Sequence, residues 1–259
     1  MKNKMTTTII SGASRGIGNA IAKDMINLDH SFLLLSGKTK ISDKEFNKKN
    51  ITKKEINFEF PQNVYKEVKK YIKNFKHDQI NIILCASQLG TFNSSNLKFD
   101  IMEMSKLFNS NLLGNISIIK AVSEIINPKI KLRIVFFGGG GAAYAYPDFF
   151  GYSISKAATV RAVENLAVIL KKITKDISII ALAPGAVNTD MLQKVLKNGA
   201  YVKTITDISE PVSFVNSFIN DKIASLELNG MFIHVRDELK DIKSRLEVNK
   251  DIFKLRRIE

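Results

Sequence analysis

The chain contains 259 residues, and its 45% of apolar residues is enough for one sizeable hydrophobic core. Its one cysteine, Cys85, excludes an internal disulfide and a thiolate cluster, and His30, His77 and His234 lack the close spacing of a zinc site. No apolar run reaches the roughly 18 to 20 residues of a membrane helix, and the first apolar stretch is too short for a signal peptide. We therefore expect a cytoplasmic protein without a membrane partner or a metal.

The net charge of +14 raises the question of a nucleic-acid partner, because a positive field attracts phosphates. The lysines are spread along the whole chain, without the interleaved aromatic residues of a single-strand binder. We therefore expect most of this charge on solvated faces and predict no nucleic-acid partner. The alternative use of such a field is to favour an anionic small-molecule substrate.

In chain order, short apolar runs alternate with segments whose apolar residues return every three or four positions. This alternation is typical of a parallel sheet covered by helices on both faces. We predict seven strands, at residues 6–10, 32–36, 56–60, 80–84, 133–137, 177–182 and 231–235. We predict helices between them at residues 18–28, 64–75, 101–126, 152–172 and 210–219.

The remaining segments are connections and a tail. Residues 38–54 are rich in lysine and asparagine, which predicts a solvated connection with a short helix. No repeat or proline-rich linker divides the chain, so residues 1–237 are predicted to form one domain. The charged residues 238–259 are predicted to be a C-terminal extension, with a helix on the surface or on a partner subunit.

A glycine-rich turn lies between the first predicted strand and the first predicted helix. It reads Ser11-Gly12-Ala13-Ser14-Arg15-Gly16-Ile17-Gly18. Glycines let the backbone turn tightly and approach a pyrophosphate, and a helix N-terminus favours the phosphate charge. Structural turns use glycine as well, but a strand before and a helix after predict a dinucleotide site.

Four motifs then occur in an order and spacing that resemble the short-chain dehydrogenase/reductase family. They are the glycine turn, Asn111 in Asn111-Leu112-Leu113-Gly114, the YxxxK pair Tyr152 and Lys156, and Pro184-Gly185-Ala186-Val187-Asn188-Thr189 as PGxxxT. The resemblance covers residues 6–237 and implies an α/β fold with a Rossmann-like, doubly wound, seven-stranded parallel sheet. It also implies an NAD(P)-dependent oxidoreductase that transfers a hydride between a nicotinamide and a carbonyl or secondary alcohol.

The resemblance assigns catalytic roles to Asn111, Tyr152 and Lys156. Tyr152 and Lys156 are four residues apart on one predicted helix, so their side chains share a face. An adjacent ammonium lowers the pKa of a phenol, and we expect Tyr152 to act as general acid or base in this way. By the same resemblance, Lys156 holds the nicotinamide ribose and Asn111 positions a water. The implied cofactor-binding residues are Gly12, Ser14, Arg15, Gly16, Ile17, Gly18, Lys38, Ala86, Ser87, Tyr152, Lys156, Pro184, Gly185, Val187 and Thr189.

Two segments depart from the family pattern. The family's catalytic serine corresponds to Gly139, in a run of four glycines, so a hydroxyl is missing that a backbone N–H could partly replace. At the end of the fourth predicted strand, Cys85-Ala86-Ser87-Gln88 replaces the family's Asn-Asn-Ala-Gly. Cys85 is interpreted as a buried small residue and not as a nucleophile.

The cofactor preference is predicted from the end of the second strand, which reads Ser36-Gly37-Lys38-Thr39-Lys40 and carries no acid to hold the ribose of NAD. Lys38, with Arg15 and Ser14, fits a 2′-phosphate, so NADP(H) is preferred and NAD(H) remains possible. The alternative is that Lys38 is one more solvated lysine.

The substrate is predicted only as a class. Residues 190–206 occupy the place of the family's mobile substrate loop, and their Lys194, Lys197 and Lys203 fit an anionic substrate. The Gly-Gly-Gly-Gly-Ala run, the Cys-Ala-Ser-Gln string and the tail Leu255-Arg256-Arg257-Ile258 resemble a branch of the family linked to surface-polysaccharide and nucleotide-sugar pathways, which implies a sugar or polysaccharide precursor as substrate. The alternatives are a 3-oxoacyl thioester reductase and a weakly catalytic dinucleotide-binding sensor or scaffold. The broad apolar surface of the predicted helix 152–172 indicates a homodimer or homotetramer.

Overall fold

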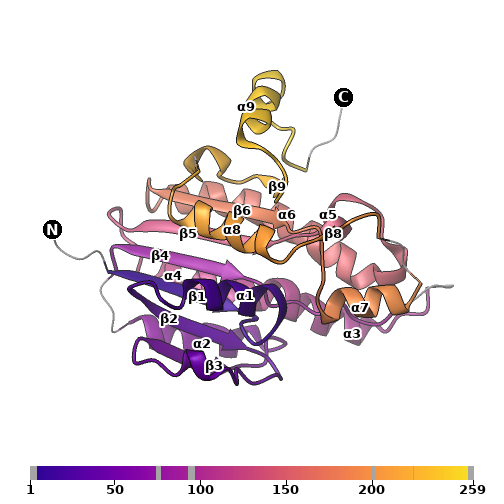
Figure 1. Ribbon diagram of the computed structural model, residues 1–259, viewed down its shortest axis with the longest axis horizontal. Coiled ribbons are helices and arrows are strands. Elements are labelled where there is room, and N and C mark those ends of the chain that lie inside the picture. Colours follow the sequence, from indigo (N-terminus) through magenta and orange to yellow (C-terminus); the bar gives the residue numbers. More distant parts are fainter. Residues whose placement is uncertain (1–4, 74–76, 93–96, 200–201, 224, 256–259) are drawn as a thin grey trace.

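The structure, a computed structural model, describes residues 5–73, 77–92, 97–199, 202–223 and 225–255. Its centre is a parallel sheet of seven strands in the order β3-β2-β1-β4-β5-β6-β9 (Figure 1). These strands are β1 Thr6–Ser11, β2 His30–Ser36, β3 Ile51–Glu55, β4 Gln79–Leu84, β5 Lys131–Phe137, β6 Ile177–Ala183 and β9 Phe232–His234. The predicted Rossmann-like, doubly wound sheet is confirmed.

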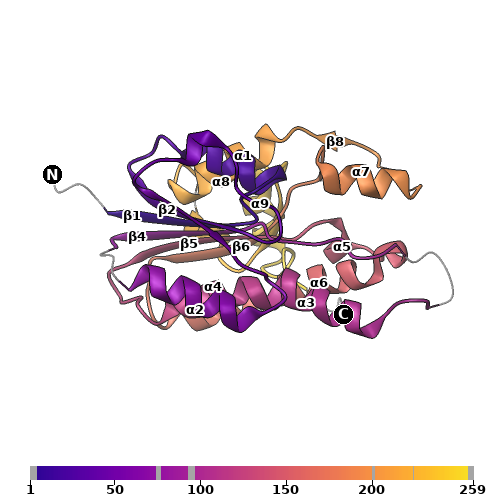
Figure 2. The same ribbon diagram turned by 90° about the horizontal axis from the view of Figure 1, so that it is seen from below.

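Helices cover both faces of this sheet (Figure 2). On one face lie α2 Pro61–Ile72, α4 Gly114–Ser123 and α6 Phe150–Lys171, and on the other lie α1 Gly16–Met25 and α8 Ser209–Ile219. Beyond the carboxyl ends of the strands are α3 Ile101–Phe108, α5 Gly140–Ala143 and α7 Asp190–Lys197 (Figure 1). The shorter elements are η1 Lys44–Phe46, the π-helical turn η2 Asn109–Leu113, η3 Pro147–Phe149, η4 Ser225–Leu228 and the strand pair β7 Ala186–Val187 and β8 Ile205–Thr206.

Two cores explain why most residues of the inner strands are apolar. Leu33 and Leu35 of β2 are buried under α2 and α4, whereas Phe32 and Leu34 are buried on the opposite face with α1. Since successive side chains of a strand point to opposite faces, a strand covered on both sides favours apolar residues on both faces. This preference is why runs such as Phe32–Leu35 could be recognised in the sequence.

The third strand was predicted at the wrong place, at residues 56–60. The structure places β3 at Ile51–Glu55, paired in register with β2 from Phe32↔Ile51 to Ser36↔Glu55. β3 is an edge strand, and its Lys53, Lys54 and Glu55 are exposed, so it lacks the apolar pattern of an inner strand. Ile56 and Phe58 are buried in the connection after the strand, which explains the misleading apolar signal.

The long helix predicted at residues 101–126 is interrupted. It consists of α3, the π-helical turn η2 and α4. The wider turn contains Asn111, and such turns inside helices are frequent at functional sites.

The C-terminal residues form α9 Leu239–Val248 and a returning segment. Ile242 and Phe253 are buried in the core on the α8 side of the sheet. Phe232 N–H of β9 donates to the carbonyl of Phe253 at 2.8 Å, so this segment lies along the edge of the sheet.

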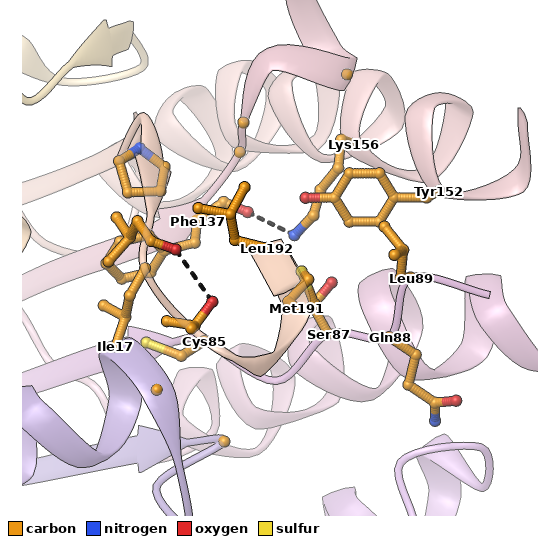
Figure 3. A pocket seen from close by; sticks show the side chains of 18 of the residues that line it. Ile17, Cys85, Ser87, Gln88, Leu89, Phe137, Tyr152, Lys156, Met191 and Leu192 are labelled. Atoms are coloured by element: carbon orange, nitrogen blue, oxygen red, sulfur yellow. Dashed lines mark hydrogen bonds between the residues drawn. The ribbon is translucent and has the colours of Figure 1, made fainter. Parts of the chain in front are cut away.

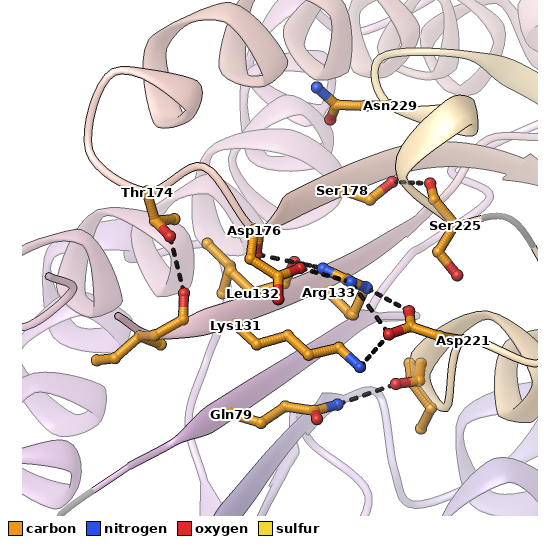
Figure 4. A network of polar contacts seen from close by, with 12 residues as sticks. Gln79, Lys131, Leu132, Arg133, Thr174, Asp176, Ser178, Asp221, Ser225 and Asn229 are labelled. Atoms are coloured by element: carbon orange, nitrogen blue, oxygen red, sulfur yellow. Dashed lines mark hydrogen bonds and ion pairs between the residues drawn. The ribbon is translucent and has the colours of Figure 1, made fainter. Parts of the chain in front are cut away.

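At the amino ends of the strands, a polar network surrounds Arg133 of β5 (Figure 4). The guanidinium is 1% exposed and pairs with Asp176 at 2.7 Å and with Asp221 at 2.9 Å. Lys131 also pairs with Asp221. A buried charge is tolerated when it is paired and hydrogen-bonded, so this network satisfies Arg133 at the edge farthest from the carboxyl ends.

Candidate active site

A cavity of about 1180 Å³ opens at the carboxyl ends of the strands. Its wall is built by the segments that follow β1, β2, β4, β5, β6 and β9. β1 lies between β2 and β4, so the strand order reverses direction at β1. Ligands of open parallel sheets bind at such a switch point, and this cavity lies in that position.

The glycine turn forms one side of the cavity and depends on its missing side chains. Gly12 has φ +70°, and a Cβ there would lie 2.8 Å from the backbone nitrogen of Ala86. Gly16 has φ +56° and begins α1, so the unpaired N–H groups of the first helical turn open toward the cavity. The turn therefore packs closely against the end of β4 and presents backbone donors to an anion.

Tyr152 and Lys156 lie on α6, and both side chains point into the cavity (Figure 3). Lys156 Nζ lies 5.5 Å from the centre of the Tyr152 ring and donates a 2.8 Å hydrogen bond to the carbonyl of Phe137. Burial lowers the pKa of Lys156 to about 8, and it raises the pKa of Tyr152 to about 12. In this arrangement the ammonium bonds to the Phe137 carbonyl and burial sets the direction of the Tyr152 pKa, so the lowering expected with a bound cofactor stays a prediction.

Asn111 is fully buried behind the cavity wall. Its Oδ1 accepts from the backbone N–H of Gln88 at 2.7 Å, and its Nδ2 donates to the Gln88 carbonyl at 2.9 Å and to Ser155 Oγ at 3.0 Å. Ser155 Oγ in turn donates to the carbonyl of Tyr152 at 2.7 Å. Asn111 thus connects the turn after β4 to the helix that carries Tyr152.

Gly139 follows β5 with φ +137° and ψ 173°. This backbone region is essentially restricted to glycine. A Cβ at this position would lie 3.3 Å from Tyr152 Oη. The position of the missing serine is therefore next to the phenol, and its backbone disfavours any side chain.

The cations predicted to surround a 2′-phosphate lie at the far end of the cavity, after β1 and β2. Lys38 and Arg15 both line the wall, as does Ser14. Lys38 Nζ lies 3.7 Å from Glu59, and Arg15 Nη1 lies 3.5 Å from Asp190. Both cations are largely exposed, so these ion pairs are weak and a phosphate can compete for them.

The segment after β6 forms the opposite wall. Pro184, Gly185, Val187 and Thr189 line the cavity and lead into α7. β7 and β8 pair at the two ends of this segment, which closes it into a flap. The three predicted lysines Lys194, Lys197 and Lys203 are all exposed, and of these Lys194 lines the cavity.

The part of the cavity near Tyr152 is apolar. Leu89, Met191 and Leu192 gather around the Tyr152 and Lys156 pair (Figure 3). A small core joins the turn after β4, the start of α6 and the flap, and it contains Leu89, Phe92, Tyr146, Phe149, Tyr152, Met191 and Val195. These contacts hold the flap over the reactive end.

The structure brings all the predicted cofactor-binding residues into the wall of one cavity, and Asn111 lies directly behind it. Sequence reasoning missed Tyr146, Leu89 and Met191, because no motif distinguishes an apolar flap contact from an ordinary core residue. Cys85 also lines the cavity, and burial raises the pKa of its thiol, as expected of an inert cysteine.

The cavity fits a pyridine dinucleotide. The glycine turn would accept a pyrophosphate at the start of α1, and Lys38 and Arg15 supply cations where the adenosine ribose would lie. Ser87 Oγ is buried in the wall, and it has no hydrogen-bond partner among the described residues. Buried hydroxyls are usually hydrogen-bonded, but this one is shut inside the wall, so the fit rests on the glycine turn and on the two cations.

Within the described ranges, we find no group of three metal-ligating side chains. No described helix has the length and apolar character that crossing a bilayer requires.

Comparison with known proteins identifies relatives over nearly the whole chain. A family model described as short chain dehydrogenase matches residues 6–200. The 3-oxoacyl-[acyl-carrier-protein] reductase FabG of Rickettsia prowazekii (strain Madrid E) is 25% identical over 235 residues, which are 88% of this chain and 94% of that protein.

Solved structures share the fold at lower identity. A short chain dehydrogenase family protein from Francisella tularensis subsp. tularensis SCHU S4 has a TM-score of 0.70 at 23% identity, over 89% of this chain and 96% of that one. A 4-hydroxyisoleucine dehydrogenase complexed with NADH has a TM-score of 0.73 at 19% identity, over 90% and 96%. BdcA in complex with NADPH has a TM-score of 0.71 at 18% identity, over 89% and 92%.

Proposed function

Because this chain belongs to the short-chain dehydrogenase family, we propose that it is an NADP(H)-preferring oxidoreductase that interconverts a carbonyl and a secondary alcohol. The observation that carries the proposal is the convergence of Tyr152, Lys156 and the glycine turn on one cavity. When bound, the nicotinamide would supply or accept the hydride.

The chain's own residues would manage the proton. In reduction, Tyr152 Oη gives its proton to the substrate oxygen, and in oxidation it takes the proton from the alcohol. A phenol with a pKa of about 12 is protonated at neutral pH and cannot take up a proton from the alcohol. Oxidation therefore needs a nearby positive charge that stabilises the phenolate. Lys156 would supply that charge and would also hold the ribose hydroxyls of a bound cofactor, and Asn111 holds the turn after β4 in place.

Tyr152→Phe tests the proposal. We expect turnover of NADPH with a panel of ketones to fall below detection, because the proton donor is lost. The dissociation constant of NADPH should change less than about threefold, because other residues of the wall remain. A Tyr152→Phe variant as active as the wild type would exclude Tyr152 from the mechanism. Tight NADPH binding by a wild type that reduces no ketone would favour a sensor or scaffold.

The preference for NADP(H) is supported by the absence of an acidic residue in residues 36–40 and by the weak pairs of Lys38 and Arg15. We expect Lys38→Ala to weaken NADPH binding about three- to tenfold and to leave NADH binding unchanged. Equal weakening of both cofactors would contradict a 2′-phosphate contact.

A 3-oxoacyl thioester is a substrate candidate beside a sugar or polysaccharide precursor. The 25% identical relative is a 3-oxoacyl reductase by name, and the apolar wall around Tyr152 suits an acyl chain. Initial rates with an acetoacetyl thioester and with keto-sugar nucleotides separate the two candidates. An anionic group on either substrate has Lys194 in the wall as a partner.

A homodimer or homotetramer is also proposed. Val168 and Ile169 of α6 are 64% and 53% exposed, and they extend the apolar surface of the helix that carries Tyr152. A monomeric mass by light scattering at assay concentration would contradict this assembly.

A further inference from the structure

We propose that Tyr146 supplies the hydroxyl that Gly139 lacks, and that its Oη donates a hydrogen bond to the substrate carbonyl oxygen beside Tyr152. The inference rests on the proposed carbonyl chemistry. Tyr146 would bind the oxygen and transfer no proton, so Tyr152 remains the acid in reduction and the base in oxidation.

The need for such a group follows from Gly139. A carbonyl that accepts a hydride develops negative charge on its oxygen, and a second donor beside the acid stabilises that charge. Gly139 has no side chain, and residues with a side chain are strained at its φ of +137°. A second side-chain donor must therefore come from another segment of the wall, and the backbone N–H groups of residues 138–141 are the competing source of a hydrogen bond.

The described hydroxyl groups of the wall leave few alternatives. Thr91, Ser110 and Thr189 donate to Glu103, to the Lys106 carbonyl and to the Val187 carbonyl, so their protons are used. Ser87 Oγ is shut inside the wall. Among the described residues of the wall, the hydroxyl groups that remain besides that of Tyr152 are those of Ser14, Thr39, Tyr144 and Tyr146.

Position separates the remaining candidates. Ser14 and Thr39 follow β1 and β2, at the end of the cavity assigned to the adenosine. Tyr144 is 79% exposed and is therefore mainly in contact with solvent. Tyr146 is the hydroxyl-bearing neighbour of Tyr152 in the small apolar core at the reactive end.

Tyr146 is also held in place while its hydroxyl is free. Its ring lies 5.3 Å from the ring of Phe149 at an interplanar angle of 46°, and Phe149 is 1% exposed. Within the described residues, Tyr146 Oη makes no hydrogen bond. Burial raises the pKa of Tyr152, and the negative charge of an ionised Tyr146 raises it further, which is consistent with a position close to Tyr152. A fixed ring with a free donor near the acid is the arrangement that a preorganised oxyanion contact requires.

Tyr146→Phe tests the role, because it keeps the ring against Phe149 and removes only the hydroxyl. With the best ketone of the panel, we expect kcat to fall about 100-fold. The NADPH dissociation constant and the melting temperature should stay at wild-type values, which a merely structural role would move. The matched control is Tyr144→Phe, an exposed tyrosine of the same segment, and its kcat should stay within about twofold of the wild type.

The outcomes separate this inference from the function on which it rests. Unchanged kcat in Tyr146→Phe would overturn the role and return it to the backbone N–H groups of residues 138–141. An equal loss in Tyr144→Phe would also overturn it, since the effect would then belong to the whole segment. A wild type that reduces no ketone would remove the proposed function itself, and the role of Tyr146 with it.

Discussion

The backbone at Gly139 predicts that restoring the family's serine harms this protein. Gly139 has φ +137° and ψ 173°, and a non-glycine residue held in this region costs about 1–3 kcal/mol. The added Cβ would also lie 3.3 Å from Tyr152 Oη, so the phenol would have to move by a few tenths of an ångström. We expect Gly139→Ser to lower the free energy of unfolding by about 2 kcal/mol and the melting temperature by roughly 4–8 °C.

The same substitution should not raise activity. Displacing the Tyr152 hydroxyl works against proton transfer, whose geometry requires close approach. We therefore expect kcat of Gly139→Ser to be at or below the wild-type value, although the family's missing hydroxyl has been supplied. Urea unfolding gives the stability, and NADPH oxidation with the best ketone gives the rate.

Gly140→Ala is the matched control, because a Cβ at Gly140 meets no atom within 4 Å and its φ is not positive. Its stability should stay within about 0.5 kcal/mol of the wild type. A Gly139→Ser variant with wild-type stability and increased kcat would refute the reasoning from backbone strain.

Two further predictions concern buried charge. Lys156 is 3% exposed, and its pKa is about 8 in the folded state against 10.5 for the free side chain, so the folded state releases this proton first and the contribution of Lys156 to the free energy of unfolding should rise by up to about 3 kcal/mol from pH 8 to pH 10.5. Burial raises the pKa of Cys85, which acts in the opposite direction, so the measured quantity is the difference in free energy of unfolding between the wild type and Lys156→Met, and a difference that does not change with pH would contradict the shift. At the amino ends of the strands, Asp221→Asn leaves Arg133 with one carboxylate, that of Asp176. We expect the free energy of unfolding to fall by about 1–3 kcal/mol, a range that allows for the 40% exposure of Asp221. In urea unfolding, Arg133→Met should lower the free energy of unfolding less than Asp221→Asn does, because the partly exposed carboxylates of Asp176 and Asp221 can then be hydrated. The reverse order would argue against a desolvated guanidinium.

The sequence predicted what depends on local pattern and on motifs. Inner strands such as β4 and β5 are apolar at most positions because both their faces are covered, and the glycine turn has the context of a strand and a helix. β3 was misplaced because an edge strand needs backbone pairing with β2 more than apolar side chains. Neither the hydrophobic pattern nor the strand propensity of residues 51–60 shows which of them pair with β2.

In the candidate site, the residues that belong to motifs were predictable from the sequence, and the contacts between distant segments were not. Motif residues such as Gly12 and Lys156 line the cavity because the fold fixes the segments that carry them. The hydrogen bond from Lys156 to Phe137, and the position of Tyr146 in the core that includes the flap, arise from packing between segments far apart in the chain. Tertiary contacts of this kind leave no periodic signal in a single sequence.

The pairing of β7 with β8 has a mechanical consequence. The segment between them leaves and rejoins the protein at almost the same point, because Ala186 pairs with Ile205 and Val187 with Thr206. Arg236 adds to this junction by bonding Thr206 Oγ1 at 3.0 Å and Glu210 at 3.2 Å. With both ends joined at this junction, the segment that carries α7 is tethered independently of the parallel sheet, so a displacement of α7 would break its contacts with Leu89 and Tyr152 but would leave the strand pairing of the sheet intact.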